Sequence, residues 1–267
     1  MIAPTERAPT ARRAVVADRS WWSEVGAHGG YLASVALAAS RAALTAQLGS
    51  ELPVRSLTTY YLKVVDDRPF MLDANVTPAG RSAGAVTITG SRDGTALLAG
   101  SAVFGASRSG PREEGHPPPS VPSPDAAESI ALRDELAPFA RRLEIRAASA
   151  ARPLASGGDV AELVGWIRFR DDRPLDAEAV TVLTDSLPPG LFARWTDPLP
   201  VPTADLTVHF TDALESAAAG WALVRIRTAH AGSGWAIDDS EVWNADGQLL
   251  ALARQTRRIL IPADRAE

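Results

Sequence analysis

The residue types that most often act as nucleophiles or metal ligands are scarce in this chain of 267 residues. It has no cysteine, which excludes a thiol nucleophile, a thiolate zinc site and a disulfide. It also lacks the Gly-x-Ser-x-Gly elbow of the α/β-hydrolases and the glycine-rich loops that bind nucleotides. His209 and His230 have no acidic residue at ligand spacing. We therefore expect no cofactor and no metal site.

A carboxylate in an apolar segment is the main candidate for chemistry. Asp185 lies in the segment Pro174 to Phe192, which predicts a helix that opens with Asp176 as N-cap and stops at Pro188. We expect this helix to be largely buried, where a carboxylate is costly unless it is hydrogen-bonded. Burial would also make the carboxylate a stronger base. The alternative is that Asp185 caps the helix end or lies on a solvated turn.

A glycine pair opens another apolar segment, earlier in the chain. Gly29 and Gly30 begin the run Gly29 to Ser50, which predicts a helix because it is rich in Ala and Leu, lacks proline and has Gly49 near its end. Its apolar residues occupy nearly all faces, so we expect it to be buried all round. Free N–H groups at a helix start suit an oxyanion. The alternative is a tight turn into a packed helix.

The two halves of the chain repeat one pattern. LTTYYLKVV begins at Leu57 and LTVHFTDAL begins at Leu206, 149 residues later. SRDGTALLAGSAVF and NADGQLLALARQTR surround Asp-Gly pairs at 93–94 and 246–247, which lie 153 residues apart. An Asp-Gly pair between alternating apolar runs predicts a hairpin. Each half therefore predicts a strand, a long loop, a strand, an Asp-Gly turn and a strand, unless two generic hairpins agree by coincidence.

A proline-rich stretch separates the halves. Residues 106–129 include six prolines between Pro111 and Pro124, which predicts an extended connector without a helix or an inner strand. We expect an N-terminal unit at 1–110, a Pro-rich linker at 111–128 and a C-terminal unit at 129–267.

Each half also places a strand before its helix, RRAVVADRS in the first and LVGWIRFR in the second. The pattern predicts an α+β fold with two hotdog units in one chain (a double hotdog), each an antiparallel sheet wrapped around a central helix. By pseudo-twofold symmetry, we expect the start of the first helix to face Asp185 across the interface.

Several stretches carry a resemblance to a known family. They are GAHGGYLASVALAA, VLTDSLPP, VPTADLTVHF and DGQLLALARQTRRI, in that order. With these stretches the chain, from about Ser20 to Leu260, resembles the double-hotdog acyl-CoA thioesterases of the thioesterase II (TesB-like) group. The resemblance implies a hydrolase that converts acyl thioesters, linked to coenzyme A or a carrier protein, to free acid and thiol.

The resemblance also implies a catalytic group. The family's Asp, Thr or Ser, and Gln fall on Asp185, Thr203 and Gln255, which would jointly hold and activate a water molecule. Read from the residues alone, Thr203 is an ordinary strand-edge threonine. Strand alternation places Gln255 on one face with Ala251 and Ala253, which suggests a polar contact inside a cavity. The alternative is an exposed glutamine among arginines.

Substrate contacts are expected at the segment His28, Gly29, Gly30 and Tyr31, where His28 departs from the residue usual in the family. Arg254, Arg257 and Arg258 would suit a coenzyme A phosphate, or form a solvated strand edge. A further set of aromatic residues would line an acyl channel or simply fill the core: Trp21, Trp22, Tyr31, Trp195 and Trp235.

Charge and hydropathy limit the partners. The formal net charge of −5 argues against general nucleic-acid binding. The N-terminus has no secretory apolar region, and the longest apolar stretch, Tyr31 to Ser40, is too short to span a bilayer. We therefore expect a cytoplasmic protein that binds an acyl-CoA or acyl-carrier-protein substrate, with no membrane partner. Exposed sheet edges favour a homo-oligomer.

Two other functions remain open. A hotdog dehydratase or hydratase needs a histidine paired with an acidic residue, and His28 has only Glu24 nearby in the sequence. A non-catalytic acyl-binding protein would keep the cavity and tolerate loss of Asp185.

Overall fold

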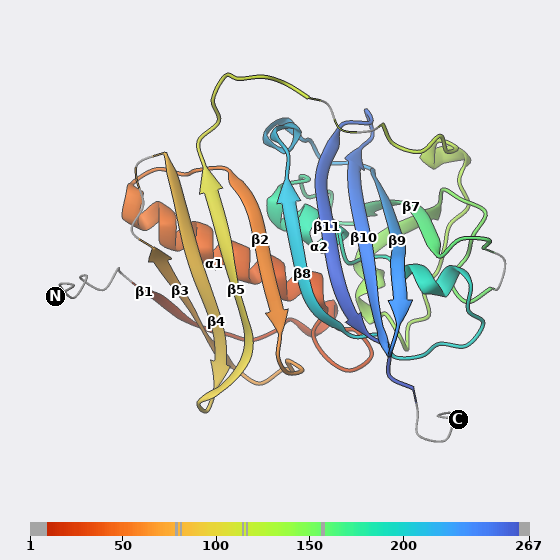
Figure 1. The fold of residues 1–267 in the computed structure, drawn as a ribbon, viewed down its shortest axis with the longest axis horizontal. Helices are drawn as coiled ribbons and strands as arrows, with labels where there is room; N and C mark the ends of the chain where they lie inside the picture. Colours follow the sequence, from red (N-terminus) through yellow and green to blue (C-terminus); the bar gives the residue numbers. More distant parts are fainter. Residues whose placement is uncertain are drawn as a thin grey trace.

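The computed structural model describes residues 10–77, 80, 82–113, 115, 117–155 and 158–261. In this part of the chain, one antiparallel sheet of eleven strands carries two α-helices on one face (Figure 1). The elements are β1 (Thr10–Val15), α1 (Gly29–Leu48), β2 (Val54–Tyr61), β3 (Phe70–Thr77), β4 (Ala83–Arg92), β5 (Thr95–Gly105), β6 (Leu143–Ala147), β7 (Glu162–Phe169), α2 (Ala177–Leu183), β8 (Thr203–Phe210), β9 (Ala222–Gly232), β10 (Trp235–Asn244) and β11 (Leu249–Arg258).

The order of the strands confirms the predicted double hotdog. The sheet runs β1-β3-β4-β5-β2-β8-β11-β10-β9-β7-β6. Outward from its centre, β2, β5, β4, β3 and β1 on one side match β8, β11, β10, β9 and β7 on the other. The predicted hairpin at 93–94 is present, and both of its residues have positive φ, at 49° and 74°. The two units therefore join edge to edge through β2 and β8 into one continuous sheet.

Helix α1 begins and ends as predicted, at Gly29 and just before Gly49, which has φ 74°. The expectation that it is buried all round is wrong. One side packs into the core through residues such as Leu37 and Leu44, while Ala42 and Ala46 are exposed. Small alanines on the outer side make the sequence look uniformly apolar, although only part of the helix surface is covered.

Helix α2 is shorter than predicted. It spans seven residues, with Asp176 as the N-cap, and ends before Thr184. The hydroxyls of Thr184 and Ser186 donate to the carbonyls of Thr181 and Val182 at 2.8 Å. Such local bonds satisfy carbonyl groups near the helix end. Asp185 therefore lies in the turn after the helix. The prediction that it lies inside the helix is wrong.

The described residues of the proline-rich segment between the units form no helix or strand, apart from a short 3₁₀ turn at Pro124–Ala126. It crosses from one unit to the other along the upper side of Figure 1. The Trp166 indole donates to the Pro122 carbonyl at 2.8 Å, and Arg146 donates to the Pro124 carbonyl at 2.7 Å. The linker therefore packs against the C-terminal unit, while the boundaries 110 and 128 stay a prediction.

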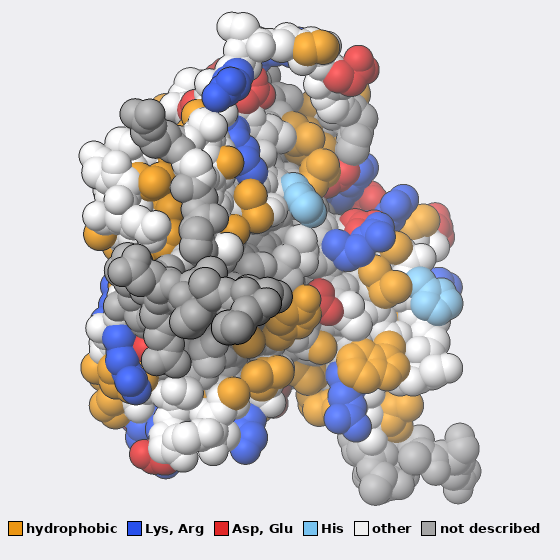
Figure 2. Space-filling model, turned by 60° about the vertical axis from the view of Figure 1, so that its left-hand side comes forward, with side chains coloured by type: hydrophobic (Ala, Val, Ile, Leu, Met, Phe, Trp, Pro, Cys, Tyr) orange, Lys and Arg blue, Asp and Glu red, His pale blue; other side chains and the backbone are white. Residues whose placement is uncertain are grey.

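Two surface properties complete the fold. No helix in the described ranges is long and apolar enough to cross a membrane. On the face in Figure 2, basic and acidic side chains lie interspersed with hydrophobic ones.

Candidate active site

Asp185 lies at the seam between the two units, directly against the start of α1. The Gly30 N–H donates to Asp185 Oδ2 at 2.9 Å. A Cβ atom on Gly29 would approach Oδ2 to 2.8 Å, so a side chain there would displace the carboxylate. Asp185 is 8% exposed. The structure thus brings the glycine pair and Asp185 together as predicted, and the solvated-turn alternative is wrong.

The Gly30 N–H is not free to bind an oxyanion, because Asp185 already accepts it. The Tyr31 N–H is also engaged, by the Nδ1 atom of His28 at 3.3 Å. No hydrogen bond to the Gly29 N–H is found among the described residues. If the helix start binds an oxygen atom, Gly29 is the donor that remains.

Arg257 is the counter-ion of Asp185. Its Nη2 donates to Asp185 Oδ1 at 3.1 Å and its Nη1 donates to the Thr203 hydroxyl at 2.8 Å. Arg257 is 5% exposed, so the interpretation of this residue as part of a solvated strand edge is wrong. Its charge and the Gly30 N–H stabilise the buried carboxylate.

Thr203 and Gln255 complete the group. The Thr203 hydroxyl donates to Gln255 Oε1 at 3.0 Å, and Gln255 Nε2 donates to the Thr184 carbonyl at 3.2 Å. Gln255 is fully buried on β11, on the inward face that strand alternation predicts. One chain of hydrogen bonds therefore leads from Asp185 through Arg257 and Thr203 to Gln255.

An irregularity in β8 turns Thr203 inward. Thr256 pairs with Asp205, but Arg257 pairs with Thr203, so Ala204 is an extra residue on β8. A one-residue slip moves a side chain to the opposite face of a sheet. The bulge at Ala204 therefore aims the Thr203 hydroxyl at Arg257 and Gln255, and no local pattern in the sequence predicts it.

His28 holds the loop that carries Asp185. Its Nδ1 accepts from the Tyr31 N–H, so its Nε2 carries the proton and lies 2.9 Å from the Asp185 carbonyl oxygen. The same Nε2 lies 3.3 Å from Asp185 Oδ2. The His28 ring also packs on Phe139, with ring centroids 4.0 Å apart. His28 thus has an acidic neighbour that the sequence did not reveal.

Tyr31 does not join this group. Its ring stacks on Trp21 with centroids 5.9 Å apart, and its hydroxyl accepts from the Asp18 N–H at 3.2 Å. Tyr31 and Trp21 are therefore part of the packing beside the helix, whereas Trp235 lines the cavity described below.

Tyr61 was missed by the sequence analysis. It is the last residue of β2, and its hydroxyl donates to the Gly29 carbonyl at 2.7 Å. Burial and the nearby Asp185 carboxylate raise the pKa of Tyr61 well above its usual value, so it stays neutral. It fixes the glycine turn from the β2 side.

A cavity of about 1030 Å³ opens at this seam. Asp185, Thr203, Arg257, His28 and Gly29 all line it. Most of its remaining wall is apolar and comes from both units: Leu32, Val65, Leu132, Leu136, Phe139, Leu187 and Phe192 among others. A long apolar chain therefore has room beside the buried carboxylate. No cluster of three or more metal-ligand side chains is present in the described segments.

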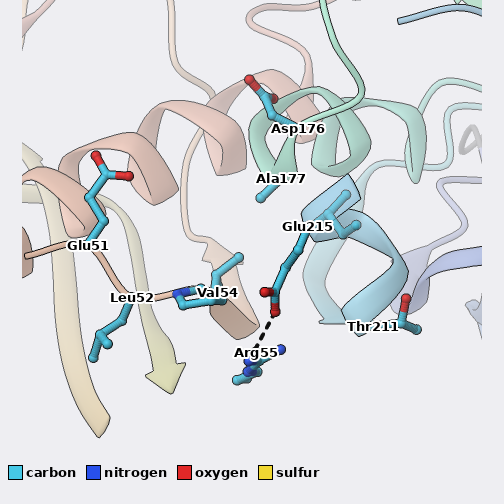
Figure 3. Close-up of a pocket in the computed structure, with 10 residues that line it drawn as sticks. Glu51, Leu52, Val54, Arg55, Asp176, Ala177, Thr211 and Glu215 are labelled. Carbon is cyan, nitrogen blue, oxygen red and sulfur yellow. Dashed lines mark ion pairs between the residues drawn. The ribbon is translucent and has the colours of Figure 1, made fainter. Parts of the chain in front are cut away.

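A second cavity of about 320 Å³ lies at the pseudo-symmetric end of the seam (Figure 3). It is lined by residues 51–55 and by Asp176 and Ala177, at the start of α2. These are the repeat equivalents of residues 200–204 and of the start of α1, which line the large cavity. Glu215 and Arg55 form an ion pair at 3.3 Å beside it.

Thr203 and Gln255 have no polar equivalents at the other end of the seam. The repeat offsets of 149 and 153 residues place Val54 at the position of Thr203 and Ala102 at the position of Gln255. Val54 and Ala102 are both buried in the apolar core. The seam thus has two similar ends, and only one of them carries Thr203 and Gln255.

Solved structures share this fold along nearly the whole chain. A conserved hot dog protein from Alicyclobacillus acidocaldarius is 24% identical, with a TM-score of 0.86 over 94% of each chain. The tesB protein of Mycobacterium avium subs paratuberculosis is 17% identical, with a TM-score of 0.74 over 94% of this chain and 93% of that one. The acyl-CoA thioesterase II TesB2 of Mycobacterium marinum is 19% identical, with a TM-score of 0.70 over 88% and 91%.

Family models agree with the double fold. The acyl-CoA thioesterase N-terminal domain matches residues 18–105, and the acyl-CoA thioesterase C-terminal domain matches residues 113–259. No curated protein sequence matches the chain. The two domain matches cover most of the chain in the family's order, and they agree with the resemblance seen in the sequence. The chain therefore belongs to the acyl-CoA thioesterase family and is a thioester hydrolase.

Proposed function

We propose that the chain hydrolyses acyl-CoA thioesters with a water molecule that Asp185 activates and that Thr203 and Gln255 help to hold. The observation that carries the proposal is the buried Asp185 carboxylate at the wall of the large cavity, within one hydrogen-bond network with Thr203 and Gln255. A thioester carbonyl is electrophilic, so its hydrolysis needs a placed water, a base and a donor to the oxyanion.

The hydrogen-bond capacity of these groups leaves room for water. A carboxylate offers about four lone-pair positions, and Gly30, Arg257 and His28 approach Asp185 from the protein. The Thr203 oxygen donates to Gln255 and accepts from Arg257, which leaves one lone pair. A water molecule between Asp185 and Thr203 can therefore donate to both oxygens.

The proposed hydrolysis consists of the addition of water and the expulsion of the thiolate. Asp185 takes a proton from water while the oxygen adds to the thioester carbonyl. The Gly29 N–H at the start of α1 stabilises the developing oxyanion. The intermediate then expels the thiolate, which takes the proton from Asp185, so that free acid and thiol leave and the carboxylate is restored.

The cavity supports coenzyme A as the carrier. Its apolar wall suits an acyl chain, whereas Lys63, Arg133 and Arg258 line the same cavity with exposed side chains. Cationic side chains at a cavity rim suit the phosphates of coenzyme A. A carrier-protein thioester offers a single phosphate, so these side chains favour coenzyme A.

One observation favours dehydration as a second candidate, because His28 Nε2 lies 3.3 Å from an Asp185 oxygen. A catalytic histidine must exchange a proton with the substrate. Here both ring nitrogens are engaged, one by the Tyr31 N–H and the other by the Asp185 carbonyl. Hydrolysis is therefore the better supported activity, and His28 holds the loop.

The test is an assay of purified protein with acyl-CoAs of increasing chain length in ¹⁸O-labelled water. The proposal expects free thiol and an acid that carries one labelled oxygen, with both products lost in Asp185→Ala. A parallel assay with 3-hydroxyacyl-CoA checks for formation of the 2-enoyl product. Enoyl formation without thiol release would support the dehydratase, and binding without turnover would support an acyl-binding protein.

A further inference from the structure

We propose that Arg257 and Asp238 act as a charge-balancing pair that positions the Asp185 carboxylate and sets the pH range in which it works as a base. The inference rests on the proposed function, since it assigns to Arg257 a positioning role for the base and to Asp238 the control of that arginine.

Three groups surround the Arg257 guanidinium: the buried Asp185 and Asp238 and the half-buried Thr203. Its Nη2 contacts Asp185, its Nη1 contacts Thr203, and its Nε lies 2.8 Å from Asp238 Oδ2. The side chains of Arg257 and Asp185 are each 7% exposed, and that of Asp238 is 0% exposed. A guanidinium that hydrogen-bonds to Asp185 and Thr203 and forms an ion pair with Asp238 is a rigid fork, so it fixes the two oxygens that we propose hold the water.

Asp238 anchors this fork from the sheet. It lies on β10 directly opposite Gln255 of β11, and the Thr228 hydroxyl donates to its Oδ1 at 2.6 Å. Its carboxylate therefore has two fixed neighbours, Thr228 and Arg257. At the pseudo-symmetric end, where Val54 and Ala102 stand at the positions of Thr203 and Gln255, the position equivalent to Arg257 is the buried Phe104.

The charges of Arg257 and Asp238 affect how readily Asp185 accepts a proton. A buried carboxylate needs a counter-charge to stay ionised, but a full unshared guanidinium would make it a weak proton acceptor. Asp238 shares the guanidinium, so the cluster of two carboxylates and one arginine keeps a net negative charge that favours proton uptake by Asp185.

The other groups around Asp185 are neutral or farther away. His28 carries one proton on its ring by the hydrogen bonds described above, and Tyr61 is neutral. The charged and titratable groups on the elements packed around Asp185 are His28 before α1, Tyr61 on β2, Asp205 on β8, Asp238 on β10 and Arg257 on β11.

The chain contains a matched control for this pair. Arg254 and Asp239 come from the same two strands and form an ion pair at 2.6 Å on the opposite face of the sheet. The side chain of Arg254 is 66% exposed. Changes to this outer pair alter the same strands and the same type of interaction without touching the cavity.

The experiment measures kcat/KM for thiol release from an acyl-CoA between pH 5 and 10 for wild type, R257Q, R257K, D238N, R254Q and D239N. We expect R257Q to move the acid limb of the profile up by about 1–3 pH units, because the counter-charge is lost. D238N moves it down, because Arg257 then acts on Asp185 alone. R257K restores the wild-type limb but not the wild-type kcat, since one ammonium cannot hold both oxygens. R254Q and D239N keep the wild-type profile.

Opposite shifts in R257Q and D238N support the inference, and a merely structural role would lower activity without moving the limbs apart. Unmoved limbs, or limbs moved in the same direction, would overturn it. D238N keeps the shape of the side chain, so even if R257Q does not fold, a downward shift of its acid limb supports the inference and an unmoved or raised limb overturns it. A wild type without thiol release would instead contradict the proposed function itself.

Discussion

Thr58 and Thr207 meet at the centre of the sheet, with hydroxyl oxygens 3.0 Å apart, although 149 residues separate them in the chain. That separation equals the offset of the repeated LT segments, so each threonine faces its own repeat equivalent across the β2–β8 pair. The local twofold axis of the double fold therefore passes between them, and the linker makes this contact between two units one within a single chain.

This central contact predicts a measurable coupling between the units. We expect Thr207→Val to lower the free energy of unfolding by about 1 kcal/mol, because the hydroxyl of Thr58 loses a half-buried partner. Thr58→Val together with Thr207→Val should cost less than the two single changes added together. Urea unfolding of the four proteins measures the cycle. Strict additivity would show that the two hydroxyls do not interact.

The glycine at the start of α1 predicts strong sensitivity to a single methyl group. A Cβ atom on Gly30 would lie 3.0 Å from Asp185 Cβ and 3.1 Å from the Val182 carbonyl oxygen. We expect Gly30→Ala to lower kcat about 10²-fold, since a displaced catalytic group costs about that much. Gly105→Ala is the control, because its Cβ meets only an ordinary contact at 3.6 Å. Equal activity of both variants would argue against a tight fit around Asp185.

Thr203 and Gln255 should affect turnover more than substrate binding. We expect Thr203→Val and Gln255→Ala each to lower kcat about 10²-fold, because each removes a polar group that places the water. The double variant should lose little more than either single one, since the two side chains act through one hydrogen bond. Steady-state kinetics tests this, and a rise in KM at unchanged kcat would assign them to binding alone.

Tyr61 predicts how stability responds to alkaline pH. Its pKa is raised in the folded protein by burial and by Asp185, so folding favours the neutral phenol. The resulting stability is fully present below the unfolded tyrosine pKa of about 10 and is lost as pH rises from there towards the folded pKa. Urea unfolding between pH 8 and 11 should therefore show a decline that is smaller in Tyr61→Phe. The same decline in both proteins would exclude Tyr61 as its cause.

Much of the fold follows from local patterns in the sequence. The order of the repeats, the Asp-Gly turn at 93–94 and the limits of α1 depend on neighbouring residues, so the sequence predicts them. The end of α2 depends instead on the hydroxyls of Thr184 and Ser186. A pattern of apolar spacing does not contain that information, and the predicted helix was therefore too long.

The site could be predicted only in part, because some of its contacts follow from the repeat and others from the pairing of distant strands. The approach of Gly30 to Asp185 follows from the symmetry of the repeat, whereas the bulge at Ala204 depends on how two distant strands pair. The role of Arg257 as the counter-ion of Asp185 was missed because three nearby arginines look alike in the sequence. The signal was present, since an inward Gln255 implies an inward residue two positions later.

The proposed hydrolysis depends most on Asp185 as the base, and the isosteric D185N variant tests this role most directly. Thiol release from the best acyl-CoA substrate is measured for D185N and wild type at the same pH, with thermal unfolding to confirm that both are folded. We expect kcat to fall about 10²- to 10⁴-fold, the range for loss of a general base. A folded D185N protein whose kcat stays within about threefold of wild type would contradict the account.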